Sequence, residues 1–238
     1  MKFGVVVFPG TNAADGITYI LEKVMHQQVH QLWHKTAELG SFSTNDCLII
    51  PTGSAFGNYL RPGALTRFSP VMEKIKAFAA KGGYVLGIGN GFQILCEAGL
   101  LPGALLPNQK GLFIAKNVYL KTITSYSPIT AAISPDTVIK LPIAHSAGRY
   151  YIDDTSLAQL KANDQILFQY CDAEGHVNPL NNPDGSTHNI AGIINQDRNV
   201  FGLMALPERA VEKIVANVDG RQLFESLIRT AKTDIISH

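Results

Sequence analysis

The repeated order of strand, turn and helix most constrains how this chain can fold. Apolar runs bounded by turn residues cover Phe3 to Phe8, Cys47 to Ile50 and Tyr84 to Ile88. Each run precedes a glycine-containing loop and then a helix-like pattern. Strands connected by crossover helices pair in parallel, so this order predicts an α/β fold with a mostly parallel central sheet flanked by helices on both faces.

The remaining elements follow from the same patterns. Ser69-Pro70 places a cap residue before a proline at the first position of a helix. Helices are predicted at Asp15 to Met25, Ser69 to Ala80, Asn90 to Glu97, Pro207 to Ala216 and Gly220 to Ala231. Further strands are predicted near Val29 and at Leu112 to Leu120, Val138 to Ala144, Ile166 to Tyr170, Ile190 to Asn195 and Val200 to Met204. The Asn, Pro and Gly-rich segment from Asn178 to Asn189 predicts a surface loop.

Length and composition narrow the class of protein. The 238 residues suit one large α/β domain over residues 1–238, and a net charge of +1 with 16% charged residues argues against nucleic-acid binding. The N-terminus is apolar for only about five residues before Pro9, too few for a signal peptide or membrane span, which favours a cytoplasmic protein. The three cysteines lie far apart without C-x-x-C spacing, so neither disulfides nor a metal site is expected at Cys47, Cys96 and Cys171.

The segment Y-V-L-G-I-G-N-G-F-Q-I-L-C from Tyr84 to Cys96 has the outline of a nucleophile elbow. In an elbow, a strained turn between strand and helix exposes the central side chain near the helix N-terminus, whose dipole favours a thiolate or an oxyanion. The central residue here is Gly89, which tolerates a positive φ but carries no nucleophile. The sequence therefore predicts elbow geometry without elbow chemistry.

Two alternative assignments of this glycine-rich turn fit less well. A dinucleotide-binding G-x-G-x-x-G pattern would place its third glycine at Phe92. An ordinary turn glycine would account for Gly89 alone, but not for the motifs around it. Cys96 cannot replace the nucleophile, because seven helical residues place it roughly 10 Å from the elbow.

Six ordered motifs along nearly the whole chain are similar to segments of one known family. G-I-G-N-G-F-Q-I-L from Gly87 is similar to that family's G-I-C-N-G-F-Q-I-L, with Gly89 in place of the cysteine. The other five are F-P-G-T-N from Phe8, P-T-G-S-A-F-G-N-Y-L-R-P-G-A from Pro51, R-F-S-P-V-M from Arg67, P-I-A-H-S-A-G-R-Y-Y from Pro142 and P-E-R-A from Pro207. In this set and order, the chain resembles the small, glutaminase subunit of phosphoribosylformylglycinamidine synthase, a class I glutamine amidotransferase.

This resemblance implies a flavodoxin-like fold and a known reaction. The family hydrolyses glutamine to glutamate and ammonia through a γ-glutamyl thioester on cysteine. The ammonia passes to a synthetase partner, which converts formylglycinamide ribonucleotide to its amidine in purine biosynthesis. By resemblance, the partner is that large subunit, and ATP and magnesium are expected only on it, with no cofactor in this chain.

The departures from the family pattern cluster where the family performs its chemistry. The family's Cys, His and Glu triad corresponds here to Gly89, Leu206 and Glu208, so the nucleophile and the base lack functional side chains. The family's oxyanion loop P-G-G-F-S corresponds here to Pro51-Thr52-Gly53-Ser54-Ala55. The resemblance assigns Thr52, Gly53 and Asn90, the residue after the elbow glycine, to the oxyanion site. With no imidazole to orient, Glu208 reads better as an acid near a helix N-terminus after Pro207.

The histidines are interpreted separately. His145 matches the family but is followed by Ser146 and Ala147 where a glycine and an acid are usual, and both a structural and an interface role stay open. His34 belongs to a W-H pair that the family shares, which favours a structural role. His26 and His30 share helical spacing with His34, but a strand beginning near Val29 would scatter them, which argues against metal binding.

Two hypotheses of function follow, from different classes. The first is a catalytically impaired subunit that keeps the fold and binds or stabilises the synthetase. The alternative is an active glutaminase that supplies ammonia to that partner. Leu206 and Thr52 count against this alternative, because they show that more than the nucleophile position differs from the family. A new ligand in the altered pocket has no positive support in the sequence.

Overall fold

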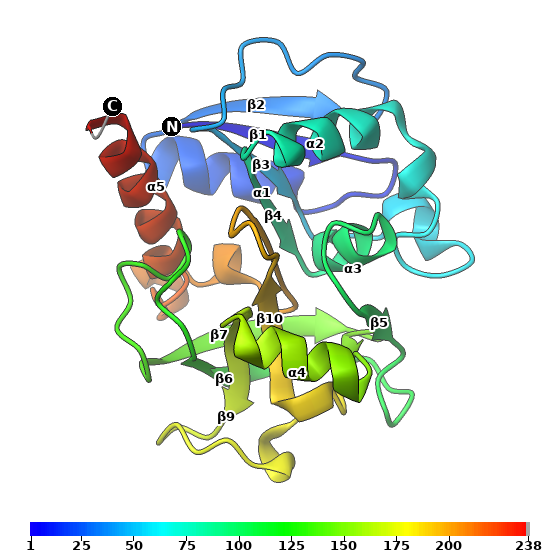
Figure 1. The fold of residues 1–238 in the computed structure, drawn as a ribbon, viewed down its shortest axis with the longest axis vertical. Helices are drawn as coiled ribbons and strands as arrows, with labels where there is room; N and C mark the ends of the chain where they lie inside the picture. Colours follow the sequence, from blue (N-terminus) through cyan, green and yellow to red (C-terminus); the bar gives the residue numbers. More distant parts are fainter. Residues whose placement is uncertain (237–238) are drawn as a thin grey trace.

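A nine-stranded sheet forms the centre of the molecule in a computed structural model (Figure 1). The structure describes the backbone of residues 1–236 and the side chains of residues 1–230. The strand order is β2-β1-β3-β4-β11-β10-β9-β6-β7, and β5 pairs with β8 in a separate sheet. The strands are β1 (Lys2–Val7), β2 (Gln28–Trp33), β3 (Cys47–Ile50), β4 (Tyr84–Ile88), β5 (Ala104–Leu106), β6 (Ile114–Thr122), β7 (Val138–His145), β8 (Arg149–Tyr151), β9 (Ile166–Cys171), β10 (Ile190–Ile194) and β11 (Val200–Leu203).

Five of these strands form the parallel half of the sheet. The pairs β2-β1, β1-β3, β3-β4 and β4-β11 are parallel, which reproduces the flavodoxin-like order 2-1-3-4-5 with β11 as the fifth strand. All residues of β3 and β11 are buried, as expected of parallel strands covered on both faces. The predicted α/β fold is confirmed. Beyond β11 the sheet continues through antiparallel pairs to β7.

Helices cover both faces of the sheet, as the sequence predicts. On one face Ile17 of α1 and Phe224 of α5 join a core cluster with β1, β3 and β4, and on the other Ile75 of α2 and Leu95 of α3 join a second cluster. The helices are α1 (Ala14–Tyr19), which continues as a π-helical turn η1 (Ile20–Val24), α2 (Pro70–Ala80), α3 (Asn90–Glu97), α4 (Asp154–Ala162) and α5 (Arg221–Ile236). Short 3-10 turns are η2 (Ala55–Asn58), η3 (Thr66–Phe68), η4 (Pro179–Asn181), η5 (Thr187–Asn189), η6 (Pro207–Arg209) and η7 (Lys213–Val215).

The helix predicted at Pro207 to Ala216 is wrong, because only η6 and η7 form there. The segment around them instead bonds to β7, the last strand of the sheet. The Leu206 N–H donates to the Pro142 carbonyl at 2.9 Å. The Asn217 Nδ2 donates to the Lys140 carbonyl at 2.7 Å, and the Lys140 N–H donates to Asp219 Oδ2 at 2.8 Å. Residues 206–219 therefore follow the edge of the sheet, with two short 3-10 turns in place of one α-helix.

The sequence pattern also missed α4. Asp153 caps this helix, and its Oδ1 accepts the Ser156 N–H at 3.0 Å. An aspartate at this position is a helix-start signal that the sequence displays. The segment from Asn178 to Asn189 is irregular, as predicted, but it is not wholly at the surface, since Asp184 is only 1% exposed. Among the described residues no helix is both long and apolar enough to cross a membrane.

Candidate functional site

The turn between β4 and α3 has the elbow geometry that the sequence predicts. Gly89 has φ 55° and ψ −109°, a conformation that glycine adopts with little strain, and its N–H donates to the Leu203 carbonyl of β11 at 2.8 Å. A β-carbon at Gly91 would lie 1.8 Å from the Ile50 carbonyl oxygen, so only glycine permits α3 to approach β3 this closely. The backbone of an elbow is therefore present without its nucleophile.

Two side chains crowd the space where that nucleophile would project. A β-carbon at Gly89 would lie 2.5 Å from Thr52 Oγ1 and 3.0 Å from Thr52 Cβ. It would also contact Leu206 Cδ2 at 3.4 Å. The structure thus brings together Gly89, Thr52 and Leu206, three positions that the resemblance predicts to depart from the family pattern. The hydroxyl of Thr52 fills the nucleophile's corner, and the apolar Leu206 closes it from the side of β11.

A cavity of about 320 Å³ lies beside this corner. Its volume is at the small end of the range for small-molecule sites. The predicted site residues Gly89, Thr52, Gly53, Asn90, His145 and Leu206 all line it, together with Asn12, Ser54, Asn58, Pro62, Gln93, Phe113, Ala144, Ser146, Ala147, Met204 and Arg209. Glu208 does not line the cavity, so the structure separates it from the other predicted residues.

Asn90 and Gln93 hold three walls of the cavity together. Asn90 Oδ1 accepts the Ala55 N–H at 3.0 Å, and Asn90 Nδ2 donates to Gln93 Oε1 at 2.8 Å. Gln93 Nε2 in turn donates to the Ala147 carbonyl at 2.6 Å. These three hydrogen bonds connect the oxyanion-loop region and α3 to the segment after β7. Sequence reasoning did not single out Gln93, although a polar residue on the buried face of a helix was a signal that could have identified it.

Glu208 is buried without a partner. Its side chain is 1% exposed, and neither carboxylate oxygen has a hydrogen-bond partner. Burial raises the pKa of Glu208 to about 7, and Arg209, with Nε 4.0 Å from Glu208 Oε1, opposes that rise only weakly. At neutral pH a substantial fraction of Glu208 is therefore protonated. The sequence predicts that Glu208 lies near the N-terminus of a helix, but the structure has only a 3-10 turn, η6, at this position.

His145 is enclosed by a polar cluster. The residue is 6% exposed, its Nδ1 lies 3.0 Å from Asn108 Oδ1, and its Nε2 lies 3.6 Å from Asp184 Oδ2. Burial lowers the pKa of His145 to about 4, so the ring is neutral at physiological pH. Burial also raises the pKa of Asp184. Because both ring nitrogens face Asn108 and Asp184, this geometry favours the structural role over the interface role.

The remaining titratable groups do not join this site. His34 is 8% exposed and its Nδ1 lies 3.3 Å from Ser69 Oγ, so Ser69 contacts this ring instead of capping α2 with its side chain. Among the described residues, His26, His30 and His34 form no group with metal-ligand spacing. Cys47 and Cys171 are buried, and burial raises the pKa of the Cys96 thiol.

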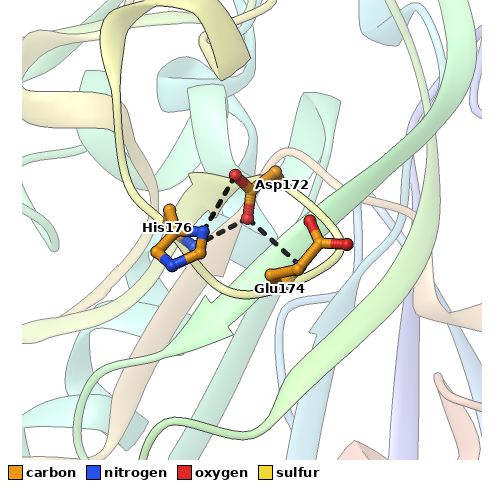
Figure 2. A group of neighbouring side chains, drawn as sticks. All are labelled: Asp172, Glu174 and His176. Atoms are coloured by element: carbon orange, nitrogen blue, oxygen red, sulfur yellow. Dashed lines mark hydrogen bonds and ion pairs between the residues drawn. The ribbon is translucent and has the colours of Figure 1, made fainter.

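One cluster with metal-ligand spacing lies elsewhere, on the hairpin after β9. Figure 2 shows Asp172, Glu174 and His176, whose potential ligand atoms lie within 4.8 Å of one another. Asp172 Oδ1 already accepts the N–H groups of Glu174 and His176, at 3.1 and 2.7 Å. These bonds account for the cluster as a turn motif of the hairpin.

The cavity has polar groups suited to binding but not the pair of groups needed for acyl transfer. Thr52 provides a hydroxyl, but among the described residues that line the cavity, His145 is the one imidazole, and its nitrogens face other residues. A hydroxyl nucleophile requires a base within hydrogen-bond reach. The arrangement can hold a small polar ligand, whereas the covalent step of a glutaminase has no nucleophile and base pair here.

Comparisons with known proteins agree with this architecture. Residues 1–230 match the family described as CobB/CobQ-like glutamine amidotransferase domain. Phosphoribosylformylglycinamidine synthase subunit PurQ of Moorella thermoacetica is 48% identical over 96% of this chain and 95% of its own length. The same subunit of Aquifex aeolicus is 45% identical over 96% of this chain and 99% of its own length.

Solved structures give the same result. The structure of PurLQS from Thermotoga maritima contains a chain with a TM-score of 0.83 and 35% identity, covering 96% of this chain and 98% of that one. A glutamine amidotransferase from Thermotoga maritima shares the fold, with a TM-score of 0.56 at 13% identity, covering 98% of this chain and 92% of that one. The chain therefore belongs to the CobB/CobQ-like glutamine amidotransferase family, among the PurQ subunits of phosphoribosylformylglycinamidine synthase.

Proposed function

We propose that this chain is a catalytically impaired PurQ-like subunit that binds or stabilises a synthetase and does not hydrolyse glutamine. One observation carries the proposal: the nucleophile position is Gly89, and the space beside it is filled by Thr52 and Leu206. Loss of the nucleophile alone costs an acyl-transfer enzyme on the order of a million-fold in turnover. Here the base position is also apolar.

The preserved parts of the molecule support a docking role. The elbow backbone and the Asn90–Gln93 hydrogen bonds maintain the cavity walls although the catalytic side chains are gone. The relatives are named as subunits of phosphoribosylformylglycinamidine synthase, and one relative is part of the PurLQS structure. By analogy, the partner is the synthetase subunit, which would use free ammonia and would itself bind ATP and magnesium. A single domain over residues 1–238 and a cytoplasmic location complete the proposal.

Ammonia release from glutamine tests this proposal. The purified chain, alone and with the synthetase of the same organism, should release ammonia no faster than a no-enzyme control, while an active PurQ relative serves as the positive control. The complex should still form amidine when ammonium salt replaces glutamine. Turnover of about 1 per second with glutamine, within the usual range for enzymes, would show that the chain is catalytic.

The alternative is an active glutaminase. Its specific support is the cavity of about 320 Å³ together with a relative, 48% identical, that is named subunit PurQ of phosphoribosylformylglycinamidine synthase. Calorimetry with glutamine separates the two possibilities, because Thr52 and Leu206 crowd the reacting corner. We expect a dissociation constant no tighter than about 1 mM, near −4 kcal/mol. Micromolar binding would mean that the glutamine site is intact and only the chemistry is lost.

A further inference from the structure

A second and larger hollow lies along β7, next to the cavity already described. This hollow, the basic groove, has a volume of about 800 Å³. Arg209 lines both the basic groove and the smaller cavity, so the two openings adjoin. The groove is lined by Asn117, Lys140, Pro142, Arg209, Lys213, Val215, Ala216, Asn217, Val218 and Asp219.

The charge of the groove departs from that of the whole chain. The chain has a net charge of +1, with 20 basic and 19 acidic residues, whereas the groove lining has three cations and one carboxylate. That carboxylate, Asp219, accepts the Lys140 backbone N–H and offsets one positive charge. The Arg209 neighbour Glu208 has a pKa raised by burial to about 7, so at neutral pH it neutralises Arg209 only in part.

The two lysines are free to pair with an external acid. Among the residues whose side chains the structure describes, neither Lys140 nor Lys213 forms an ion pair with a carboxylate. The Lys140 Nζ lies 5.7 Å from the centroid of the Tyr119 ring, which leaves its hydrogen-bond donors to other partners. Lys140 and Lys213 are both exposed.

Apolar side chains stand beside these charges. Val215 and Val218, 55% and 40% exposed, line the groove, and Ile214, 90% exposed, lies next to Val215 at its rim. This wall is held in place, since Asn217 and Asp219 bond to the backbone of Lys140. Exposed aliphatic side chains grouped on a pinned segment are typical of a surface that contacts another protein.

We propose that the basic groove is where an acidic segment of the synthetase docks. Carboxylates of that segment pair with Lys140 and Lys213, and an apolar side chain packs on Ile214 and Val215. This inference rests on the proposed docking function and names its surface. Because Arg209 joins the groove to the cavity, a partner bound here also covers the cavity's mouth.

Charge reversal tests the surface. The variant Lys140→Glu/Lys213→Glu should bind the synthetase at least about tenfold more weakly in surface plasmon resonance, because like charges then face the acidic segment. Raising salt from about 0.05 to 0.5 M should weaken the unmodified complex more than the variant complex. Ile214→Ser should weaken binding by a smaller factor with little change in salt dependence.

A matched control carries the same change of charge at a distance. Lys74 lies in α2 and Lys81 directly follows it. The variant Lys74→Glu/Lys81→Glu should therefore change affinity by less than about twofold. Thermal unfolding of each variant checks that the fold is intact. If the synthetase binds but the groove variants bind as tightly as the control, the groove is not the docking surface, although the docking function stands. If no complex forms with the unmodified chain, the docking function itself is wrong, and this surface with it.

Discussion

The two sides of the cavity differ in how their polar groups are satisfied. On the elbow side, the backbone keeps the left-handed turn at Gly89, and the hydrogen bonds of Asn90 and Gln93 are complete. On the side of β11, Leu206 is apolar, and Glu208 is buried with neither oxygen hydrogen-bonded. The fold needs the first set of interactions to bring α3 against the sheet. The architecture is kept without a polar side chain at Leu206 and without a hydrogen-bonded carboxylate at Glu208.

The largest expected effect comes from rebuilding both sides together. Gly89→Cys alone should stay inactive, since a thiol with a pKa of about 8.5 lacks a basic partner and its β-carbon would meet Thr52. Adding Leu206→His supplies a base, and partial recovery is expected. Adding Thr52→Gly as well should raise ammonia release further, because it removes the 2.5 Å contact.

The control for this series is Thr52→Gly/Leu206→His, which lacks the thiol and should release no ammonia from glutamine. Full activity of Gly89→Cys alone would show that the side of β11 was never limiting. A folded but inactive triple variant would show that the pocket has diverged at further positions. Either result would mean that the side of β11 is not the one feature that keeps the elbow side inactive.

The next effect concerns the elbow side alone. Gly91→Ala should destabilise the protein by about 3 kcal/mol or more, because its β-carbon would lie 1.8 Å from the Ile50 carbonyl oxygen, a backbone atom that cannot rotate away. Gly16→Ala in α1 is the matched control, since it has no atom within 4 Å and should stabilise its helix by about 0.5–1 kcal/mol. Urea unfolding of the two variants makes the comparison. Equal stabilities would mean that α3 is not held as closely as described.

The smallest effect concerns Glu208. Its folded pKa of about 7 exceeds its ordinary value of 4.5, so the folded state binds the proton more tightly than the unfolded state does. Stability from this group is therefore greatest below about pH 4.5, falls as the pH rises towards 7, and levels off above it. Glu208→Gln should remove that slope and raise the free energy of unfolding at pH 8 by on the order of 2 kcal/mol.

Unfolding in urea at pH 5 and pH 8 measures this effect. Glu174→Gln makes the same substitution on the exposed hairpin after β9 and serves as the control. A Glu208→Gln protein that is less stable than the parent at pH 8 would indicate a partner for the carboxylate, and the side of β11 would then be as complete as the elbow side.

The sequence was sufficient to predict the parts that depend on local patterns. Buried strands such as Cys47–Ile50, and the glycine spacing of the elbow, are set by periodicity and backbone freedom, which a single sequence displays. The resemblance located Gly89 and Leu206, and the structure places them in one cavity.

The remaining features depend on distant contacts. The segment after Pro207 has a helix-like pattern, but bonds to Pro142 and Lys140 decide its conformation, and these lie more than sixty positions away. The resemblance indicated that Thr52 adds bulk on the oxyanion side, but not that its hydroxyl lies where a β-carbon at Gly89 would project, nor that Glu208 is buried without a hydrogen-bond partner. Tertiary packing decides both.

The hydrogen bonds along β7 also limit how this chain can associate with others. The outward Lys140 N–H and the Lys140 and Pro142 carbonyls are already satisfied by residues 206–219, and Pro142 has no N–H to offer. An extended peptide therefore finds the middle of β7 already bonded, which disfavours its addition as a tenth strand there. The same covering disfavours strand-to-strand aggregation at this part of the edge. It leaves side chains, whose charge and shape differ from one surface to another, as the means by which a partner is selected there.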